Sequence, residues 1–349
     1  MLEARTKAWQ QDKKSLNYHV TATMLTELKK QPETAFLNEV SSVALQQSLR
    51  HLDSAFRNFF ANRTDYPTFK SRKTAQSVRY ANNAFTLKGD KLTLARQSQP
   101  LAISWSRPLP EDAQIQCLTI SRDAADRYFV SIHFDTNVKP LKKVKATVGI
   151  DVGLKDLATL SNGEKLPNPK FLQKKQRRLK IRQRRLSRKV KGSNNRNKAR
   201  LEIARIHAKV ADSRRDYLHQ FTTKTIRENQ AVFVEGLGVA NMLKNHCLAK
   251  AISNAAWGEM FRQLEYKAGW YGRTYLALDR FFPSSKLCSA CGHLLIKLPL
   301  SVREWDCPSC SAHHDRDTNA AINIKIAGEY LLYTESDARK STPLRDEKP

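Results

Sequence analysis

Two short stretches decide the fold: Thr147-Val148-Gly149-Ile150-Asp151-Val152-Gly153 and Ala231-Val232-Phe233-Val234-Glu235. Each is an apolar, β-rich run with one carboxylate at or near its end, which is typical of a buried central strand. Taken alone, such an acid is more often a solvated residue at a strand end than part of a site. Two central strands that each deliver an acid at their carboxyl ends are nevertheless the usual arrangement for a site on an open sheet. Asp151 and Glu235 are therefore candidate site residues.

A third group of acids lies near the end of the chain, in His313-His314-Asp315-Arg316-Asp317-Thr318-Asn319-Ala320-Ala321-Ile322-Asn323-Ile324. An acid-rich loop here precedes a helical pattern, and carboxylates at a helix start can be simple caps. Together with Asp151 and Glu235, an acid from this group would complete a set of hard oxygen ligands for Mg²⁺. Two such ions about 4 Å apart can activate a water and stabilise the leaving oxygen in phosphodiester cleavage. The pattern indicates a nuclease.

The cysteines give the most specific spacing in the chain, CxxC-x15-CxxC, which fits a zinc ion held by Cys288, Cys291, Cys307 and Cys310. Four thiolates leave no open position on the metal, so we expect a structural zinc and not a catalytic one. Three histidines nearby are reserve ligands that this spacing does not require: His293, His313 and His314.

Composition points to a polyanionic partner. The 349 residues contain 61 Lys or Arg and 33 Asp or Glu, a net charge of +28, and 40% are hydrophobic, enough for two or three domains with real cores. Charge of this size favours nucleic acid as the partner. No long apolar run and no signal-peptide pattern occurs, so we expect a cytoplasmic, nucleoid-associated protein without a membrane partner.

The charge is concentrated between Lys170 and Arg215, which contain 19 Lys or Arg and two acids and so carry +17 of the +28. Apolar residues at helical spacing on both sides of Gly192-Ser193-Asn194-Asn195 predict two antiparallel helices with basic outer faces. Few acids are present to pair within the helices, so phosphates must screen the like charges. We therefore prefer nucleic-acid contact to a solvated face, through Lys174, Lys175, Arg177, Arg178, Arg182, Arg184, Arg185, Arg188 and Lys189.

The first half of the chain changes period near residue 77. A helical stripe runs from Leu45 to Phe60, with Ser41 or Ser42 as its cap, so the first seventy residues are predicted to be helical. Alternating patterns then predict a small antiparallel sheet or barrel, with strands at 85–87, 92–94, 101–105, 115–121 and 128–134.

These residues resemble a known family, the TnpB or OrfB-type transposase proteins, which are transposon-encoded RNA-guided DNA endonucleases related to type V CRISPR effectors. The resemblance covers roughly residues 3–330. Its most specific pieces are Gly149-Ile150-Asp151-Val152-Gly153-Leu154-Lys155, Val234-Glu235-Gly236-Leu237, Phe282-Pro283-Ser284-Ser285-Lys286, Arg303-Glu304-Trp305-Asp306-Cys307 and the run HDRDTNAAINI at 314–324.

The resemblance implies an α/β RuvC-like nuclease domain of ribonuclease H fold with an inserted zinc ribbon. An N-terminal helical recognition lobe and a small antiparallel β-barrel, the wedge, would precede it. The expected ranges are 1–76 for the lobe, 77–140 for the wedge, 146–280 and 315–334 for the nuclease, including a basic hairpin at 170–229, 281–314 for the ribbon and 335–349 for a disordered tail.

The resemblance also implies the site. The family holds Mg²⁺ with an Asp, Glu, Asp triad, and the matching positions are Asp151, Glu235 and the acid directly before x-Asn-Ala-Ala, which is Asp317. Asp315 is the competitor for the third role. The implied cofactors are catalytic Mg²⁺ and structural Zn²⁺, and the implied partners are a guide RNA from the transposon end and target double-stranded DNA.

Family members that look like this chain usually begin with a further strand and helix ahead of Glu3-Ala4-Arg5-Thr6-Lys7. A barrel without its first strand has an unpaired edge and a poorer core. Two alternatives to a guided nuclease follow: a truncated nucleic-acid-binding remnant without cleavage activity, and a RuvC-like nuclease that needs no RNA. Retention of all three acids favours the enzyme, and copurifying RNA would separate the last alternative from the others.

Overall fold

The computed structural model describes residues 1–70 and 76–341, with side chains up to residue 334. The chain divides into two compact units. The first comprises residues 1–137 together with 200–205, and the second comprises 138–199 and 206 onward. None of the helices in the described ranges combines the length and the apolar character that a membrane crossing requires.

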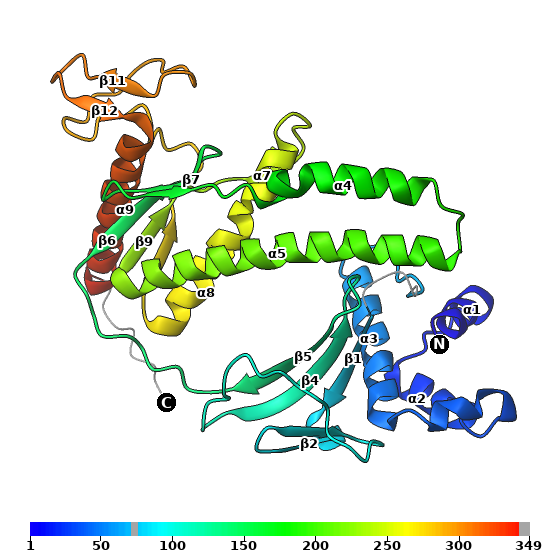
Figure 1. Ribbon diagram of the computed structural model, residues 1–349. Helices are drawn as coiled ribbons and strands as arrows, with labels where there is room; N and C mark the ends of the chain where they lie inside the picture. Colours follow the sequence, from blue (N-terminus) through cyan, green and yellow to red (C-terminus); the bar gives the residue numbers. More distant parts are fainter. Residues whose placement is uncertain (71–75, 342–349) are drawn as a thin grey trace. The chain divides into compact units, whose positions relative to one another are not determined.

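The first unit begins with helices, as predicted: α1 (Leu2–Asp12), α2 (Tyr18–Leu28), the 3-10 helix η1 (Pro32–Asn38) and α3 (Ser42–Phe60) (Figure 1). Ser41 occupies the N-cap position of α3, but its side chain makes no capping hydrogen bond. Asn17 does cap α2, because its side-chain oxygen accepts a hydrogen bond from the backbone N–H of Val20 at 3.1 Å.

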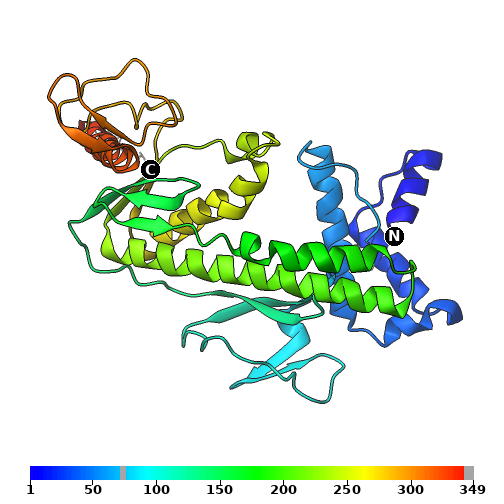
Figure 2. The same ribbon diagram turned by 45° about the horizontal axis from the view of Figure 1, so that its top comes forward.

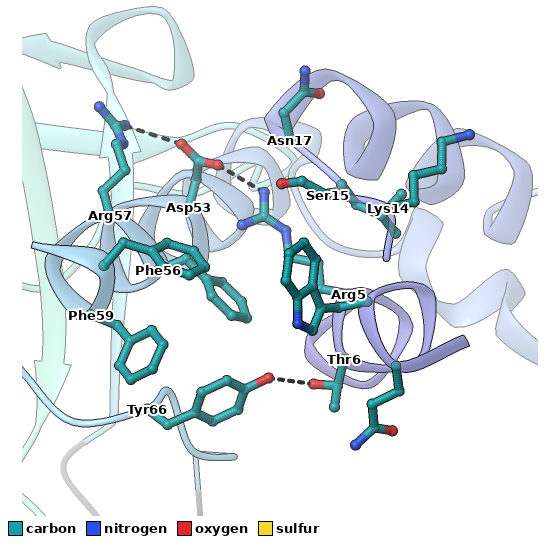
Figure 3. Close-up of a pocket in the computed structure, with 14 residues that line it drawn as sticks. Arg5, Thr6, Lys14, Ser15, Asn17, Asp53, Phe56, Arg57, Phe59 and Tyr66 are labelled. Carbon is teal, nitrogen blue, oxygen red and sulfur yellow. Dashed lines mark hydrogen bonds and ion pairs between the residues drawn. The ribbon is translucent and has the colours of Figure 1, made fainter. Parts of the chain in front are cut away.

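A pocket of about 470 Å³ opens between α1 and α3 (Figure 3). The buried guanidinium of Arg5 donates to Asp53 at 2.8 Å on one side, and the hydroxyls of Thr6 and Tyr66 lie 2.7 Å apart on the other. Aromatic rings of α3, among them Phe56 and Phe59, form much of its wall. The Arg5–Asp53 contact joins α1 to α3, and the Thr6–Tyr66 contact joins α1 to the segment that follows α3.

Strands complete the first unit. A three-stranded antiparallel sheet has the order β1-β4-β5, formed by β1 (Gln76–Ala81), β4 (Gln114–Arg122) and β5 (Tyr128–Asp135). The short helix η2 (Asn82–Ala84) leads from β1 into a hairpin of β2 (Phe85–Lys88) and β3 (Lys91–Leu94). Leu92 and Leu94 of the hairpin share one core with Leu118 of the sheet, so the two sheets pack through apolar side chains.

One predicted strand of this region is absent, and one observed strand was not predicted. Residues 101–105 form no strand, although the N–H of Leu101 donates to the backbone oxygen of Leu92 at 2.8 Å. The segment lies between prolines at 100, 108 and 110, which have no backbone N–H to donate to a neighbouring strand. Strand β1 was not predicted, because its mostly exposed residues show no apolar alternation. Among the described residues the hydrogen-bonded ladders form two separate sheets and do not close into a barrel.

The second unit is built on a five-stranded mixed sheet in the order β10-β9-β6-β7-β8. Its strands are β6 (Thr147–Asp151), β7 (Asp156–Leu160), β8 (Lys165–Pro167), β9 (Ala231–Val234) and β10 (Thr274–Ala277). Strands β9 and β10 run parallel to β6, whereas β7 returns antiparallel to β6 and β8 returns antiparallel to β7. The two quoted apolar runs are therefore the neighbouring central strands, as the sequence predicts.

Helices cover both faces of this sheet (Figure 1). On one face, Ile150 and Val234 pack against α5 (Asn194–Glu228) and α8 (Trp257–Tyr271), where Leu218 and Leu264 are almost completely buried. On the other face, Phe233 of β9 packs with Ile324 of α9 (Arg316–Ser341). The result is an α/β/α arrangement, which agrees with the predicted α/β class.

Two glycines allow α9 to lie directly on the sheet. A Cβ atom on Gly149 of β6 would overlap the backbone oxygen of Ala321, and one on Gly328 of α9 would overlap the ring of Phe233. Glycine is therefore required at both positions by close approach of the two elements. This packing fixes α9, and with it the acids at its start, relative to the ends of β6 and β9.

The basic segment forms two antiparallel helices, α4 (Phe171–Ser187) and α5, which lie side by side in both views (Figure 2). Arg196 near the start of α5 donates to the backbone oxygens of Leu186 and Lys189, at 3.0 and 2.8 Å, and so closes the connection between them. The prediction of a helical hairpin is confirmed. Two shorter helices, α6 (Val239–Met242) and α7 (Ala249–Ala255), lie between β9 and α8.

The cysteine-rich segment forms a small module at the start of α9. Its two-stranded antiparallel sheet pairs β11 (Glu304–Asp306) with β12 (His313–Asp315), and β12 runs directly into α9. Helix α9 continues to Ser341, so the prediction of a disordered tail from residue 335 was wrong for 335–341. The remainder of that predicted tail, 342–349, lies outside the described residues.

Candidate functional site

Asp151 and Glu235 lie at the same edge of the sheet. Asp151 is the last residue of β6, and Glu235 directly follows β9. The two strands are parallel with Ile150 opposite Val234, so the next residue of each strand is the acid. The parallel pairing thus places both carboxylates at the carboxyl ends of neighbouring strands, as expected for a site on an open sheet.

The surroundings of Asp315 and Asp317 differ. The carboxylate of Asp315 accepts a hydrogen bond from Lys165 Nζ at 2.8 Å and another from the Thr318 N–H at 2.9 Å, so it is ion-paired and caps α9. Asp317 lies in the first turn of α9, and its charge acts on Asp151. Asp317 is therefore, of these two acids, the one whose charge acts on the Asp151 carboxyl group.

Asp151 has the electrostatics of a buried carboxyl group with other acids nearby. Loss of hydration, followed by the charges of Glu235 and Asp317, raises the pKa of Asp151 well above its ordinary value. Loss of hydration also raises the pKa of Glu235. Burial and like charges both disfavour ionised carboxyl groups, and a bound cation relieves both. Such shifts are typical of functional sites.

A guanidinium that the sequence analysis did not single out lies at this site. Arg303, just before β11, places its Nη1 atom 3.5 Å from a carboxylate oxygen of Asp317. Its backbone oxygen also accepts a hydrogen bond from the N–H of Arg316 at 2.8 Å. Arg303 belongs to one of the segments that resemble the family, but nothing in its spacing showed that it would face the carboxylate of Asp317, fourteen positions further along the chain.

Two buried asparagines of α9 hold the lead into the cysteine module. Asn319 donates to the Leu287 oxygen at 2.8 Å and accepts from the Ser289 N–H at 3.0 Å. Asn323 donates to the backbone oxygens of Ser284 and Leu287, at 2.8 and 2.6 Å. These amides satisfy buried backbone groups, so the module and the helix that carries Asp317 are joined through hydrogen bonds as well as by chain connection.

The four cysteines converge. The sulfur atoms of Cys288, Cys291, Cys307 and Cys310 all lie within 4.8 Å of one another. Two Sγ–Sγ separations, 3.7 Å between Cys288 and Cys310 and 3.6 Å between Cys291 and Cys307, match the ~3.8 Å expected for a zinc–thiolate tetrahedron with Zn–S bonds of about 2.3 Å. All six cysteines of the chain are free thiols. The donor set therefore fits zinc.

Within the described residues, the four cysteines are the one group of three or more His, Cys, Asp or Glu side chains that lie close enough together to hold a metal ion. The carboxylates of Asp151, Glu235 and Asp317 interact electrostatically but are less tightly gathered. The histidines His293 and His313 are exposed and stand outside the cluster, whereas His314 is buried beside it.

The nine basic residues predicted to contact nucleic acid all lie on α4 or directly after it. Seven of them are exposed: Lys174, Lys175, Arg177, Arg178, Arg184, Arg185 and Arg188. Arg182 and Lys189 are partly covered. The helix presents a dense row of cations to solvent, as the sequence predicts.

Comparison with known proteins identifies the family. The family model for "Probable transposase" of the OrfB type matches residues 125–246, and the model for the Cas12f1-like TNB domain matches residues 257–324. The second match spans the thiol cluster, Arg303 and Asp317.

Curated relatives cover nearly the whole chain. A protein of Streptomyces pristinaespiralis named "Putative RNA-guided DNA endonuclease" is 53% identical over 94% of this chain and 81% of its own length. InsQ of Escherichia coli, with the same description, is 32% identical over 96% of this chain and 86% of its own length. Among solved structures, Cas12f1 in a complex with sgRNA and target DNA aligns over 93% of this chain and 78% of that chain, with a TM-score of 0.55 at 15% identity. The chain therefore belongs to the TnpB, or OrfB-type, family.

Proposed function

We propose that this protein is an RNA-guided DNA endonuclease that cleaves phosphodiester bonds with Mg²⁺ held by Asp151, Glu235 and Asp317. The proposal rests on the placement of Asp151 and Glu235 at one sheet edge and on the charges of Glu235 and Asp317 that act on Asp151. The relatives of this chain are named as RNA-guided DNA endonucleases. The strand order, with three antiparallel strands followed by two parallel to the first, supports a RuvC-like domain of ribonuclease H type.

The residues at this edge fit Mg²⁺. Carboxylate oxygens are the ligands this ion prefers, and a bound cation would offset the loss of hydration that raises the pKa values of Asp151 and Glu235. When bound, Mg²⁺ supplies an activated water and charge stabilisation at the leaving oxygen. The three side chains must ionise and close around the ion, and Asp315 stays in its cap and ion pair.

Arg303 has a supporting role in this proposal. Its guanidinium beside Asp317 carries a positive charge that a scissile phosphate could meet, because guanidinium groups bind phosphate oxygens in a bidentate manner. The zinc ribbon would thereby contribute a side chain to the nuclease site. Zn²⁺ bound by Cys288, Cys291, Cys307 and Cys310 would stabilise the ribbon without taking part in the chemistry.

The guide and the target follow from the family and from charge. The Cas12f1 structure is a complex with sgRNA and target DNA, and α4 offers the exposed cations that a nucleic-acid backbone requires. We propose a transposon-end RNA as guide and duplex DNA as target. We assign the helices of residues 1–76 to a recognition lobe and the strands of 77–140 to a wedge.

The test is cleavage by the reconstituted complex of protein and guide RNA. Asp317→Ala should abolish cutting of a matched duplex and leave RNA and target binding nearly unchanged. Asp315→Asn is the matched control, since asparagine can still cap α9. It should retain most of the activity.

Each other outcome overturns a defined part of the proposal. Cutting by Asp317→Ala, with no cutting by Asp315→Asn, would transfer the third role to Asp315. Tight nucleic-acid binding by a wild-type complex that never cuts in Mg²⁺ would identify a binding remnant. Equal cutting with and without RNA would identify an unguided nuclease.

A further inference from the structure

His314 is buried against the thiol cluster and is not needed as a ligand. It lies on β12, opposite Trp305 of β11, and its ring packs on the Trp305 ring with centroids 4.7 Å apart. Only 8% of the residue is exposed. Its Nε2 atom lies 3.0 Å from the sulfur of Cys288, which is itself 1% exposed. The imidazole therefore makes a specific contact with one member of the cluster.

The direction of this hydrogen bond follows from metal chemistry. A cysteine that ligates zinc is a thiolate, and a thiolate has no proton to donate. The N–H must then belong to His314. A neutral imidazole has one N–H, and placing it on Nε2 directs it at the Cys288 sulfur. The imidazole ring also packs against the Trp305 ring, with an angle of 42° between the two planes.

Charge explains why such a donor is useful. Four thiolates carry four negative charges and zinc carries two positive ones, so the centre has an excess of negative charge. Cys288 and Cys307 are buried, where water cannot compensate that charge. Donors in the outer shell of a metal centre orient the ligands and alter the metal affinity, and their loss costs about 10–100-fold.

We propose that His314 is a positioning residue of the zinc centre, which donates its Nε2–H to the Cys288 thiolate and thereby slows zinc release. The proposal rests on the zinc assigned under Proposed function to the four cysteines. It gives a role at the metal centre to one of the three histidines near the cluster and assigns none there to His293 or His313.

The test is the rate of zinc release from the full-length protein to a chromophoric chelator. His314→Phe keeps a ring against Trp305 and removes the donor, and it should release zinc about 10–100-fold faster. His314→Gln restores an N–H near the Nε2 position and should return the rate most of the way to wild type. His313→Phe is the matched control, since the neighbouring imidazole is exposed and pairs with Asp306 instead. It should release zinc at the wild-type rate.

Wild-type release by His314→Phe would overturn the proposal. Equal loss in His314→Phe and His314→Gln would do so as well, because restoring an N–H donor would then not restore zinc retention. A protein that binds no zinc would refute the zinc assignment itself. Neither zinc binding nor zinc release is measured through nuclease activity, so both results are independent of cleavage.

Cobalt substitution distinguishes a donor from a ligand. With four sulfur ligands, the Co²⁺ spectrum of wild type and of His314→Phe should be the same, whereas Cys310→Ser should change it. If the wild-type spectrum instead shows three sulfurs and one nitrogen, and His314→Phe alters it, then His314 is a ligand and the positioning role is wrong.

Discussion

The guanidinium of Arg303 lies 3.5 Å from the carboxylate of Asp317, although the first belongs to the cysteine module and the second to α9. Their backbones are also linked, because the Arg303 oxygen accepts the N–H of Arg316 at 2.8 Å. The module and the proposed nuclease site thus meet at this pair. Cleavage should depend on the module for this reason, even if its zinc takes no part in the chemistry.

Arg303→Ala should reduce the cleavage rate on the order of 10²-fold, the scale for loss of one preorganised charge-stabilising donor. Arg303→Lys should keep part of the activity, since it retains a charge but not the planar fork. Lys297→Ala, at an exposed position of the same module, should leave the single-turnover rate unchanged. A wild-type rate for Arg303→Ala would show that this guanidinium does not act on the reaction.

Metal removal tests the carboxylates through stability. The pKa of Asp151 is raised in the folded state by loss of hydration and by the charges of Glu235 and Asp317. Without metal, its contribution to stability is fully present below the unfolded-state pKa and is lost as pH rises through the folded-state pKa. Asp151→Asn should therefore raise the melting temperature at pH 7 in EDTA.

Mg²⁺ should raise the melting temperature of the wild type and have little effect on Asp151→Asn. The exposed carboxylate of Asp65 provides the control, and Asp65→Asn should respond to Mg²⁺ as the wild type does. An Asp151→Asn protein that melts below the wild type in EDTA at pH 7 would contradict the repulsion among these acids.

Two helical glycines should respond to alanine in opposite directions. Gly328→Ala would drive a Cβ into the ring of Phe233, and overpacking of this kind costs typically about 1–3 kcal/mol. Gly269 of α8 has no atom near the place of an added Cβ, so Gly269→Ala should stabilise the protein by about 0.5–1 kcal/mol. Denaturant unfolding measures both changes. Equal effects at the two positions would mean that α9 does not pack directly on β9.

Loss of one zinc ligand should loosen the module and leave the rest of the second unit folded. Cys307→Ser should lose zinc by elemental analysis and increase hydrogen exchange from about residue 284 to 314, because ligand binding energy is also folding energy for so small a module. Cys247→Ser changes an exposed cysteine outside the cluster and should retain one zinc per chain. If elemental analysis found no zinc in carefully prepared wild-type protein, the assignment of zinc to this cluster would be wrong.

Binding of RNA to α4 should be strongly salt-dependent. Each lost phosphate contact should reduce the slope of log affinity against log salt by about 0.7 for single strands and 0.9 for a duplex. Charge reversal of Arg184, Arg185 and Arg188 should lower both affinity and slope, and replacement by three glutamines should give a smaller change in the same direction. Fluorescence anisotropy at several salt concentrations measures the affinity and the slope. An unchanged slope would mean that the basic residues of α4 face solvent and do not contact RNA.

Local patterns and spacings in the sequence determined the central strands, the thiol cluster and the basic helical hairpin of this protein. The apolar runs ending at Asp151 and Glu235 predicted two central strands, because a strand buried on both faces must be apolar throughout. The CxxC pairs predicted a four-thiolate cluster, because the two cysteines of each pair are close enough in the sequence to bind the same metal ion. The basic helical hairpin followed from period and charge. Each of these features is encoded within a short segment.

Tertiary structure decided what depends on contacts between distant segments. Spacing could not show that Asp315 would be occupied by Lys165, which lies on β8, or that Asp317 would act on Asp151. The partners of Arg303 and His314 were equally hidden. Strand β1 was not predicted because its residues show no apolar alternation, and the strand is defined by its hydrogen bonds to β4. Long-range packing, above all of α9 on Gly149, selects among residues that the sequence leaves equivalent.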